Sequence, residues 1–345
     1  MESYLYKLAT DEARGFLAAI FKAGLFILSL IYGCFIRALA AFYLLRPRRL
    51  GCQVVSIGNI TLGGTGKTSL VEFVAGYLKN QGHKVAVLSR GYKRQGGMGD
   101  EPLMLQKNLR DVMVLVDADR VRAAERAMRD YQADSLVLDD GFQQWRIKKD
   151  LEIVTIDSTD PFGNRQVLPR GILREPLSAL KRADIFVLTK ANLNPDTLDI
   201  ADFLKQVNPR AAIFQAAHQP KGFCRLGSQE TFGPEALKGK TAAIFCGIAD
   251  PESFENLVSG LGIRVGLNFS FPDHYAYTKD DLEKIKTAAA RKGIDTIITT
   301  EKDAARLEEL GVRSSELGVF VLRIALKIVK DEEGFHERLS GLYRA

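Results

Sequence analysis

Short apolar runs alternate with longer stretches of helical spacing over most of this chain. Short apolar runs bounded by polar residues are typical of buried strands, whereas apolar residues three or four positions apart indicate amphipathic helices. In the first half we expect helices over 69–78 and 118–131. The strands predicted for this half are 54–57, 85–88, 112–116, 135–138 and 151–156. Strands that alternate with helices predict βαβ units and a mostly parallel sheet.

A segment rich in Pro, Gly and Arg interrupts this alternation between residues 160 and 180, and it is a candidate active-site loop or domain junction. The alternation then resumes. The later predicted strands are 185–188, 212–214, 242–245, 264–269 and 296–298, with helices near 196–206, 251–260 and 278–291. With 345 residues the chain exceeds the size at which a single core usually stops growing, so we expect two domains.

We therefore predict an α/β protein with four parts. A hydrophobic and basic helical segment covers 1–50, and a parallel-sheet domain covers 51–180. A second, smaller α/β domain covers 181–318. The remaining part, 319–345, contains a last predicted strand at 319–324 and a tail, and it can return to either domain.

The N-terminal segment carries an uncharged run of 13 residues, 24–36, between Lys22 and Arg37, and a basic cluster follows at 46–49. The run is shorter than the roughly 20 apolar residues that span a bilayer. Acidic residues upstream argue against a signal peptide. A bulky apolar helix with basic ends suits the interface of an anionic membrane, so we favour peripheral attachment. A helix buried against the domain and a true membrane span are the alternatives.

Composition narrows the function only slightly. The chain is 46% hydrophobic and 26% charged, as ordinary globular proteins are. Its net charge of +6 suits an acidic partner such as a nucleotide, a phospholipid surface or a nucleic acid, without choosing among them. The four cysteines show no paired spacing, which argues against a disulfide framework and against a zinc site.

The segment Gly58-Asn-Ile-Thr-Leu-Gly-Gly-Thr-Gly-Lys-Thr-Ser69 follows a predicted strand and opens a predicted helix. In a P-loop, glycines let successive backbone N–H groups point at the phosphates, and the helix N-terminus adds its dipole. Lys67 would reach the β- and γ-phosphates, and the hydroxyl of Thr68 would face Mg²⁺. The strict motif has glycine in place of Thr61, and a chance glycine loop is the alternative. The predicted ATP-binding residues are Gly63, Gly64, Thr65, Gly66, Lys67, Thr68 and Ser69.

Two adjacent carboxylates, Asp139 and Asp140, follow the apolar run 136–138. P-loop enzymes hold Mg²⁺ with an acidic residue at the end of a neighbouring buried strand. A helix cap or a turn is the alternative. Because the pair is followed by Gly141-Phe142-Gln143 and accompanies a P-loop, it predicts a metal and nucleotide site.

Phosphoryl transfer also needs a group that accepts the proton of the attacking hydroxyl. Asp100 lies after a glycine-rich turn, where a surface turn with a capping aspartate is the alternative. His274 follows a predicted strand and Asp273, in a place where α/β domains present functional groups. His83 and His336 are expected to be solvated.

Positive charge is needed to stabilise the transferring phosphoryl group. The candidate arginines are Arg90, Arg120, Arg170 and Arg174. Glu175, in the 160–180 segment, is a candidate metal ligand. The segment Thr300-Glu-Lys-Asp303 fits either a loop that reads a nucleotide base or a helix N-cap, and the sequence does not choose between them.

In this order and spacing the motifs resemble the tetraacyldisaccharide 4′-kinases, the lipid A 4′-kinases of Gram-negative bacteria. The resemblance covers nearly the whole chain, and the family's looser P-loop also admits Thr61. The segments that carry it, besides the apolar basic N-terminus and the P-loop, are Leu88-Ser-Arg-Gly-Tyr92, Gly99-Asp-Glu-Pro102, Asp119-Arg120, Asp139-Asp-Gly-Phe-Gln143, Leu173-Arg-Glu-Pro176, Phe271-Pro-Asp-His-Tyr275 and Thr300-Glu-Lys-Asp303.

The resemblance implies transfer of the γ-phosphate of ATP to the 4′-hydroxyl of a tetraacylated glucosamine disaccharide 1-phosphate, which forms lipid IVA in lipid A biosynthesis. It implies a P-loop NTPase-like domain and a second α/β/α domain joined by a short β linker, with the site in the cleft between them. It also implies that the N-terminal helix attaches the enzyme, as a peripheral or monotopic protein, to the cytoplasmic face of the bacterial inner membrane.

The resemblance also assigns roles to residues. It implies that Asp100 is the general base, that His274 is its partner in a dyad, and that Arg120 stabilises charge. The positions that it places near Mg²⁺, in addition to Thr68, are Asp139, Gln143 and Glu175.

A membrane-recruited regulatory ATPase, of the kind that positions partition or division machinery, is the second hypothesis. It also combines a Gly-Gly-x-Gly-Lys-Thr loop with an amphipathic membrane helix, but its signature lysine is replaced here by Leu62. A GTPase is disfavoured because the segment 188–192 lacks a proper Asn-Lys-x-Asp base reader. No recognition motif supports binding to nucleic acid.

Overall fold

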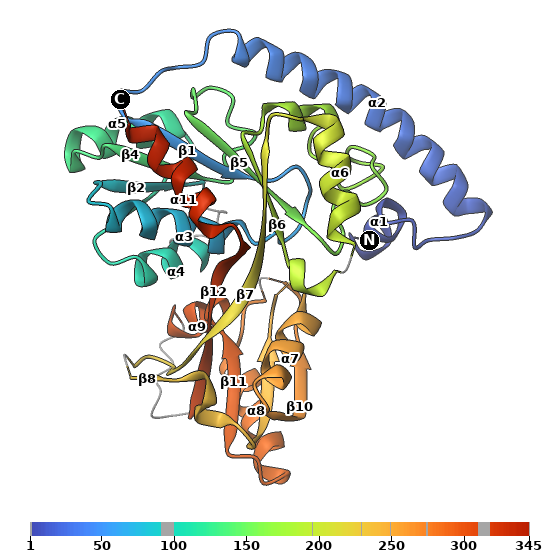
Figure 1. The fold of residues 1–345 in the computed structure, drawn as a ribbon. Helices are drawn as coiled ribbons and strands as arrows, with labels where there is room; N and C mark the ends of the chain where they lie inside the picture. The colour runs from blue at the N-terminus through green and yellow to red at the C-terminus, as the bar shows by residue number, and fades with distance from the viewer. Residues whose placement is uncertain are drawn as a thin grey trace. The chain divides into compact units, whose positions relative to one another are not determined.

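The computed structural model describes residues 2–90, 100–194, 196–228, 230–248, 250–273, 275–309 and 318–344. The chain forms two compact units (Figure 1). Unit 1 contains Met1–Tyr92, Leu109–Ala217 and Lys327–Ala345, and unit 2 contains Lys93–Asn108 and His218–Leu326. The predicted boundary after residue 180 therefore falls inside unit 1. The C-terminal tail, whose placement the sequence left open, belongs to unit 1.

Unit 1 is built on a parallel sheet, as the alternating pattern predicts. Its strands are β1 (Gln53–Gly58), β2 (Val85–Ser89), β3 (Met113–Val116), β4 (Ser135–Asp139), β5 (Leu151–Asp157), β6 (Ile185–Thr189) and the first part of β7 (Ala212–Arg225). They lie in the order β7-β6-β5-β1-β4-β2-β3, and neighbouring strands run parallel. The strands β1, β4 and β2 are almost wholly buried, which explains their continuous apolar sequence.

Helices cover the sheet of unit 1 and bury its apolar side chains. They are α3 (Lys67–Asn80), α5 (Arg120–Tyr131), α6 (Thr197–Val207) and α11 (Glu332–Ser340), with short 3₁₀ turns η1 (Leu177–Arg182), η2 (Ala191–Leu193) and η4 (Gly341–Tyr343). One core cluster joins β2 and β4 to α5, and a second joins β5 and β6 to α6. The parallel strands therefore end at a common edge, at which loops meet.

Unit 2 has a second parallel arrangement of strands, in the order β10-β9-β11-β12. Its strands are β8 (Thr231–Phe232), β9 (Thr241–Cys246), β10 (Arg264–Ser270), β11 (Thr296–Thr300) and most of β12 (Val319–Lys330). Its helices are α4 (Asp100–Asn108), α7 (Pro251–Gly260), α8 (Lys279–Arg291), α9 (Glu301–Glu309) and the 3₁₀ turn η3 (Pro234–Leu237). The helix α4 belongs to unit 2 although its sequence lies between two strands of unit 1.

Two strands are longer than their apolar runs predict. The strand β7 continues to Arg225 and β12 to Lys330, and each contributes to both units. Buried and partly exposed positions are mixed along the extension of β7, so that polar residues such as Gln219 and Lys221 interrupt its apolar pattern. A pattern search based on continuous apolar runs therefore ends too early.

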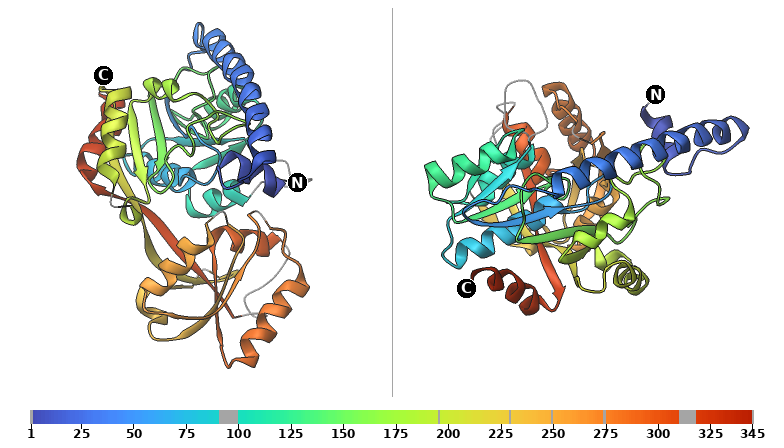
Figure 2. Two further views of the ribbon diagram at one scale, coloured as in Figure 1. Left: turned by 90° about the vertical axis from the view of Figure 1, so that its right-hand side faces the viewer. Right: turned by 90° about the horizontal axis from the view of Figure 1, so that it is seen from above.

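The N-terminal segment forms a short helix, α1 (Glu2–Ala9), and a long one, α2 (Phe16–Leu44). The helix α2 has 29 residues, longer than the uncharged run indicates, and its length and composition would allow it to cross a membrane. It extends along the outside of unit 1 (Figures 1 and 2). Its buried residues are small or polar, and its large apolar side chains are mostly exposed. The alternative of a helix buried in the domain is therefore wrong.

Two histidines that we expected to be solvated are instead packed against aromatic rings. His336 stacks on Tyr77 with ring centroids 4.1 Å apart, and His83 stacks on Tyr343 at 3.7 Å. Both contacts fasten the C-terminal segment of the chain to unit 1. His83 lies in a predicted helix-to-strand turn and His336 in a charged tail, so both positions looked exposed. Their aromatic partners lie far away along the chain and could not be seen in the local sequence.

Candidate functional site

The predicted P-loop lies between the end of β1 and the start of α3. Gly63 and Gly66 have φ angles of 110° and 76°, in the left-handed region that favours glycine. Gly66 is the N-cap of α3 and supplies no capping side chain, and the first turn of the helix contains no acidic residue. The helix N-terminus therefore combines backbone N–H groups and a positive dipole end with Lys67, Thr68 and Ser69, as a phosphate site requires.

Buried hydroxyl groups hold the loop against the sheet. Thr65 Oγ1 lies 2.8 Å from Thr155 Oγ1 of β5, and Thr189 Oγ1 of β6 donates to the carbonyl oxygen of Thr65 at 3.1 Å. The hydroxyl of Thr155 also donates to the carbonyl oxygen of Gly58, at 3.2 Å. The loop conformation is thus determined by neighbouring strands as well as by its glycines.

Asp140 lies among positive charges beside the P-loop. Its Oδ2 accepts a hydrogen bond from Nη1 of Arg174 at 2.7 Å, and its Oδ1 lies 3.8 Å from the ammonium nitrogen of Lys67. Burial opposes ionisation of this carboxyl group, but the charges of Lys67 and Arg174 outweigh it and hold the pKa of Asp140 below its usual value. Asp140 is therefore ionised at neutral pH and keeps the Lys67 side chain near the loop.

Asp139 is the last residue of β4 and is buried. The parallel pairing of β4 with β1 aligns Asp139 with Ile57, one residue before β1 ends. Its Oδ2 accepts a hydrogen bond from the hydroxyl of Ser89, at the end of β2, at 3.0 Å. The carboxylate is thus oriented by a neighbouring strand at the edge of the sheet that carries the P-loop.

Gln143 and Glu175 are brought together from two separate segments. Gln143 Nε2 donates to Glu175 Oε1 and to the carbonyl oxygen of Asn59, both at 3.1 Å. Arg182 Nη2 donates to the same Glu175 oxygen at 2.9 Å. Glu175 is only 2% exposed, so this ion pair is buried on the carboxylate side. Gln143 therefore connects the P-loop segment to the carboxylate.

Arg182 also contacts the Asp-Asp-Gly-Phe-Gln segment directly. Its guanidinium carbon lies 4.3 Å from the centroid of the Phe142 ring, a cation–π contact. Phe142 itself is fully buried, and Lys149 donates to its carbonyl oxygen at 3.3 Å. Arg182 thus positions both Glu175 and the segment that carries the aspartates, although Arg182 lies outside every motif found in the sequence.

Close backbone packing explains two glycines of this region. A Cβ atom on Gly58 would lie 2.5 Å from the backbone nitrogen of Phe142, and one on Gly141 would lie 2.4 Å from Ser56 Oγ. Neither distance is compatible with a side chain at these positions. The two glycines therefore let the P-loop strand and the segment after β4 approach each other.

Arg120 is buried at the start of α5, where Asp119 caps the helix by accepting from Val121 N–H. Its Nη1 donates to the carbonyl oxygen of Asp117 at 3.3 Å. Burial lowers the pKa of Arg120, and the carboxylates of Asp139 and Asp140 oppose that shift. The electrostatic interaction indicates that Arg120 faces the same edge as the two aspartates.

The other candidate arginines lie in different settings. Arg174 belongs to the site, as described above. Arg90 follows β2, and its positive charge helps to lower the pKa of Arg120. Arg170 is instead paired with Asp11 at 2.7 Å and donates to the carbonyl oxygen of Leu8, so it joins the N-terminal segment to the 160–180 segment.

The structure does not describe the side chains of the two residues predicted for proton transfer. The side chain of Asp100, at the start of α4, and the whole of His274 are outside the described residues. Next to Asp100 in the chain, Glu101 accepts from the ammonium group of Lys302 at 2.6 Å.

The segment Thr300–Asp303 forms a reciprocal N-cap at the start of α9. Thr300 Oγ1 donates to Asp303 Oδ2 at 2.6 Å, and the Asp303 N–H donates back to Thr300 Oγ1 at 3.1 Å. Tyr277 donates to the other oxygen of Asp303, at 3.0 Å. The N-cap interpretation is therefore confirmed, and the base-reading role stays a prediction.

The donor set at the sheet edge suits Mg²⁺ better than a softer metal. Thr68 and Asp139 offer oxygen atoms, which Mg²⁺ prefers. Among the described residues, no group of three or more His, Cys, Asp or Glu side chains forms a metal cluster.

The helix α2 is attached to the segment that carries Arg174 and Glu175. Ser29 Oγ donates to the carbonyl oxygen of Val167 and accepts from the N–H of Arg170, each at 2.9 Å. The Tyr32 hydroxyl donates to the carbonyl oxygen of Arg174 at 2.9 Å. One narrow side of α2 is thus fastened to the site, whereas the opposite side exposes Phe and Leu side chains.

Known proteins are similar to this chain in sequence and in fold. A family model described as tetraacyldisaccharide-1-P 4′-kinase matches residues 21–344. A tetraacyldisaccharide 4′-kinase of Halothermothrix orenii is 35% identical, with 95% of this chain and 94% of the relative covered. One of Desulfatibacillum aliphaticivorans is 37% identical, with 92% and 90% covered. The crystal structure of LpxK from Aquifex aeolicus in complex with ATP is similar, with a TM-score of 0.73, 28% identity, and 94% of this chain and 99% of that chain covered.

Proposed function

The chain belongs to the tetraacyldisaccharide 4′-kinase family, and from this premise we propose that it transfers the γ-phosphate of ATP to the 4′-hydroxyl of tetraacyldisaccharide 1-phosphate. The product is lipid IVA, an intermediate of lipid A biosynthesis. The observation that carries the proposal is the P-loop with Lys67 held beside Asp140 and Arg174, in a chain that matches the family over nearly its full length.

ATP would lie with its phosphates on the loop 63–66 and the first turn of α3. Backbone N–H groups there bind phosphate oxygens, and Lys67 reaches the β- and γ-phosphates. Thr68 and Asp139 would hold Mg²⁺, while Gln143 and Glu175 orient that side of the site. When bound, Mg²⁺ neutralises the charge that develops on the phosphate oxygens.

Transfer forms a bond between the 4′-oxygen of the acceptor and the γ-phosphorus, and it breaks the bond from that phosphorus to the bridging oxygen of ADP. In the proposed mechanism Asp100 accepts the proton of the 4′-hydroxyl, and His274 orients Asp100. Arg120 and Arg174 supply fixed positive charge near the reacting phosphate. The contact of Arg174 with Asp140 keeps this charge in place before the substrate arrives.

The lipid acceptor requires access to a membrane, and we propose that α2 provides it at the cytoplasmic face of the inner membrane. The exposed side of α2 carries large apolar side chains, among them Phe16 at 81% and Phe35 at 62% exposure. Burying such side chains in the interfacial region stabilises attachment in proportion to their area. Because the Tyr32 hydroxyl of the same helix donates to the carbonyl oxygen of Arg174, the membrane-attached helix directly contacts a residue of the phosphate site.

A phosphotransfer assay with labelled ATP, Mg²⁺ and acylated disaccharide 1-phosphate in detergent micelles tests the reaction. We expect a labelled lipid product that requires both Mg²⁺ and the disaccharide. ATP hydrolysis without any lipid product would contradict the kinase and favour a regulatory ATPase.

A separate flotation assay tests the attachment. Removal of residues 1–45 should release the protein from vesicles, and continued binding of the shortened chain would assign attachment to another surface.

A third experiment tests the proposed general base. Asp100→Asn in the full chain should reduce turnover and leave ATP affinity nearly unchanged. A loss of ATP affinity alone would refute Asp100 as the base.

A further inference from the structure

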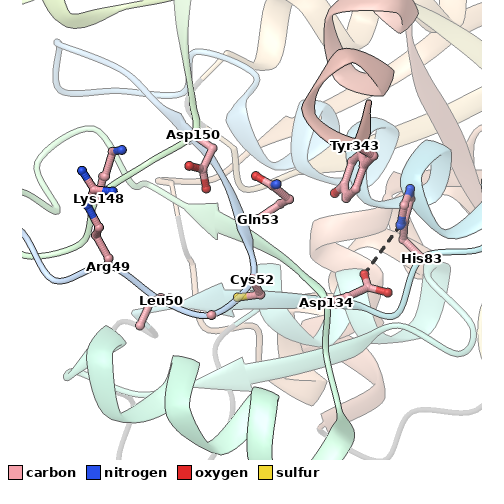
Figure 3. A pocket seen from close by; sticks show the side chains of 10 residues that line it. Arg49, Leu50, Cys52, Gln53, His83, Asp134, Lys148, Asp150 and Tyr343 are labelled. Carbon is pink, nitrogen blue, oxygen red and sulfur yellow. Dashed lines mark ion pairs between the residues drawn. The ribbon is translucent and has the colours of Figure 1, made fainter. Parts of the chain in front are cut away.

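The amino ends of the strands in unit 1 carry a cavity, at the opposite edge of the sheet from the P-loop. It has a volume of about 620 Å³, within the range of small-molecule sites. Its lining residues immediately precede or begin strands β1, β2, β4 and β5 or belong to the C-terminal segment (Figure 3). We call it the amino-edge pocket; its lining residues are Arg49, Leu50, Gly51, Cys52, Gln53, His83, Asp134, Lys148, Asp150 and Tyr343.

One side of the amino-edge pocket is positively charged. The backbone of Arg48 accepts from Lys148 N–H at 2.9 Å and donates to Arg146 at 2.8 Å, so that the segments bearing Arg49 and Lys148 run side by side. Arg48 pairs with Glu125, and Arg146 lies 3.6 Å from Asp119. In the part of the chain that the structure describes, neither Arg49 nor Lys148 forms an ion pair. These two cations are therefore available to an anionic ligand.

Two carboxylates also line the pocket: Asp134 on the opposite side, and Asp150 between Asp134 and the two cations (Figure 3). Asp134 directly precedes β4 and accepts from the Ser135 hydroxyl at 2.6 Å, and Asp150 directly precedes β5 and accepts from Val54 N–H at 2.9 Å. Burial and these two carboxylates raise the pKa of the Cys52 thiol to about 11. Both carboxylates thus lie near Cys52, which we call the floor of the pocket. The Val54 N–H and the Ser135 hydroxyl hold them in place.

An aromatic wall closes the side of the pocket on which Asp134 lies. Tyr343 stacks on His83 at a centroid distance of 3.7 Å, and its hydroxyl donates to Ser135 Oγ at 2.7 Å. His83 Nδ1 in turn lies 3.7 Å from Asp134. Figure 3 shows Tyr343, His83 and Asp134 on one side of the pocket and Arg49 and Lys148 on the other. A ligand that fills the pocket therefore meets opposite charges at its two ends.

The chain runs from the apolar helix directly into this pocket. The helix α2 ends at Leu44, Leu45 is 79% exposed, and Arg49 already lines the pocket. Figure 1 shows this connecting segment on the side of unit 1 along which α2 extends. Basic residues that follow a lipid-contacting helix lie at the level of the phospholipid headgroups. The mouth of the pocket would then be at the depth where headgroups are found.

We propose that the amino-edge pocket binds the headgroup of a phosphoethanolamine lipid. Arg49 and Lys148 hold the phosphate, and Asp134 and Asp150 accept hydrogen bonds from the ammonium group. The proposal rests on the membrane attachment proposed above for α2, because that attachment brings headgroups to the pocket.

The charge pattern selects this headgroup among the common ones. A purely anionic headgroup would leave the two carboxylates without a cation and would be repelled by them. A choline headgroup carries a positive charge but has no N–H group to donate to a carboxylate. Only a headgroup with a phosphate and a primary ammonium group satisfies both sides.

Calorimetric titration of the full chain in detergent, with the soluble headgroup glycerophosphoethanolamine, tests the pocket independently of membranes. We expect saturable binding, weakened at least about tenfold for glycerol phosphate and for glycerophosphocholine, because each loses a charge-assisted hydrogen bond. Equal affinity for glycerol phosphate would refute a role for the carboxylates. Absence of saturable glycerophosphoethanolamine binding would overturn the proposal.

The variant Arg49→Gln/Lys148→Gln removes the positive side, and Arg46→Gln is its matched control from the same basic run outside the lining. The double variant should lose at least about tenfold in glycerophosphoethanolamine affinity, and the control should keep it. An equal loss of affinity in both variants would mean that overall positive charge, and not the pocket, binds the headgroup, and it would overturn the proposal. Unchanged melting temperatures of both proteins exclude unfolding as the cause.

Flotation on vesicles without net charge separates the pocket from the attachment. Replacing part of the phosphatidylcholine by phosphatidylethanolamine should increase the bound fraction of the wild type and not that of the double variant. If the wild type floats on neither vesicle but still binds glycerophosphoethanolamine, attachment through α2 is refuted and the pocket is supported. An equal increase for the double variant would refute the pocket as the source of lipid preference.

Discussion

At the carboxyl ends of β1 and β4, charged side chains are paired and largely buried, whereas at the amino ends of the same strands they stand at the surface. Asp140 is held between Lys67 and Arg174, and Glu175 is enclosed by Gln143 and Arg182. At the opposite edge, the charges of Arg49 and Lys148 are exposed.

The difference follows from what each edge has to do. Phosphoryl transfer needs charges that are already oriented before the substrate arrives, because reorientation during the reaction would raise the barrier. Such orientation requires buried hydrogen bonds and close backbone packing, as at Gly58 and Gly141. Headgroup binding needs only complementary charge at a wet surface. The carboxyl edge is therefore rigidly assembled and the amino edge is open.

The largest effect is expected at the centre of the rigid edge. Lys67→Ala should reduce phosphotransfer by roughly two to three orders of magnitude, because a positive charge aimed at the transferring phosphate is lost. Transfer of labelled phosphate under single-turnover conditions measures it. Lys79→Ala, on the same helix but donating to the carbonyl oxygen of Arg110 at the surface, is the control. Equal losses in both variants would mean that α3 is merely destabilised.

At the open edge, the thiol of Cys52 reports on the carboxylates of the amino-edge pocket. Its pKa is raised from 9.0 to about 11 by burial and by Asp150 and Asp134, so the reactive thiolate forms only as the pH rises through 11. At pH 8 alkylation should be about 100-fold slower than for an ordinary thiol. Mass spectrometry of iodoacetamide-treated protein between pH 7 and 11 measures the rate.

The variant Asp150→Asn supplies the control for the thiol measurement. It removes one of the two carboxylates but keeps an oxygen that accepts from Val54 N–H. The rate profile of Cys52 should therefore move to lower pH. A wild-type rate that already levels off near pH 9 would contradict the negative floor of the pocket.

Two glycines, one at each edge, test the difference in packing. Gly141→Ala should destabilise the protein by about 1–3 kcal/mol, because the new Cβ would lie 2.4 Å from Ser56 Oγ and 2.8 Å from Leu138 Cβ. Gly51→Ala, in the amino-edge pocket, places its Cβ in open space and should be nearly neutral. Urea unfolding of both variants provides the free energies. Similar values for the two would remove the distinction between a rigid and an open edge.

A smaller effect on activity is expected from Arg182, which contacts Glu175 and Phe142 at the carboxyl edge. Arg182→Gln should raise the Mg²⁺ concentration needed for half-maximal activity by roughly tenfold. The substitution removes the ion pair with Glu175 and the cation–π contact with the Phe142 ring. Arg165→Gln removes another arginine over a ring, that of Phe203, and should leave the Mg²⁺ dependence unchanged. A matching shift in the control would show that the effect is not specific to Glu175.

Local features of the site were predictable from the sequence. The P-loop is one contiguous segment whose glycines and lysine act through the backbone of that segment, and the structure has it between β1 and α3 as predicted. Asp139 was predicted as a metal ligand because the end of an apolar run marks a strand end, and the structure has it as the last residue of β4. Asp140 was recognised only as its neighbour, because its pairing with Lys67 and Arg174 joins three separate segments.

Other features could not be read from the pattern. The helix α4 is packed in unit 2, although its sequence interrupts the strands of unit 1. Arg182 has no motif around it and gains its importance only from Glu175 and Phe142. The full length of α2 exceeds its uncharged run, because Lys22 and Arg37 are accommodated within the helix.

The sequence by itself thus determined the parallel α/β class, the phosphate-binding loop and the family, since each depends on short-range periodicity or on contiguous motifs. Only the tertiary structure decided the strand order, and with it which charges are paired at the carboxyl edge and which remain exposed at the amino edge. The physical reason is that the partners of these charges lie tens to hundreds of residues away in the chain. Their meeting depends on how the strands are ordered in the sheet, which no local pattern encodes.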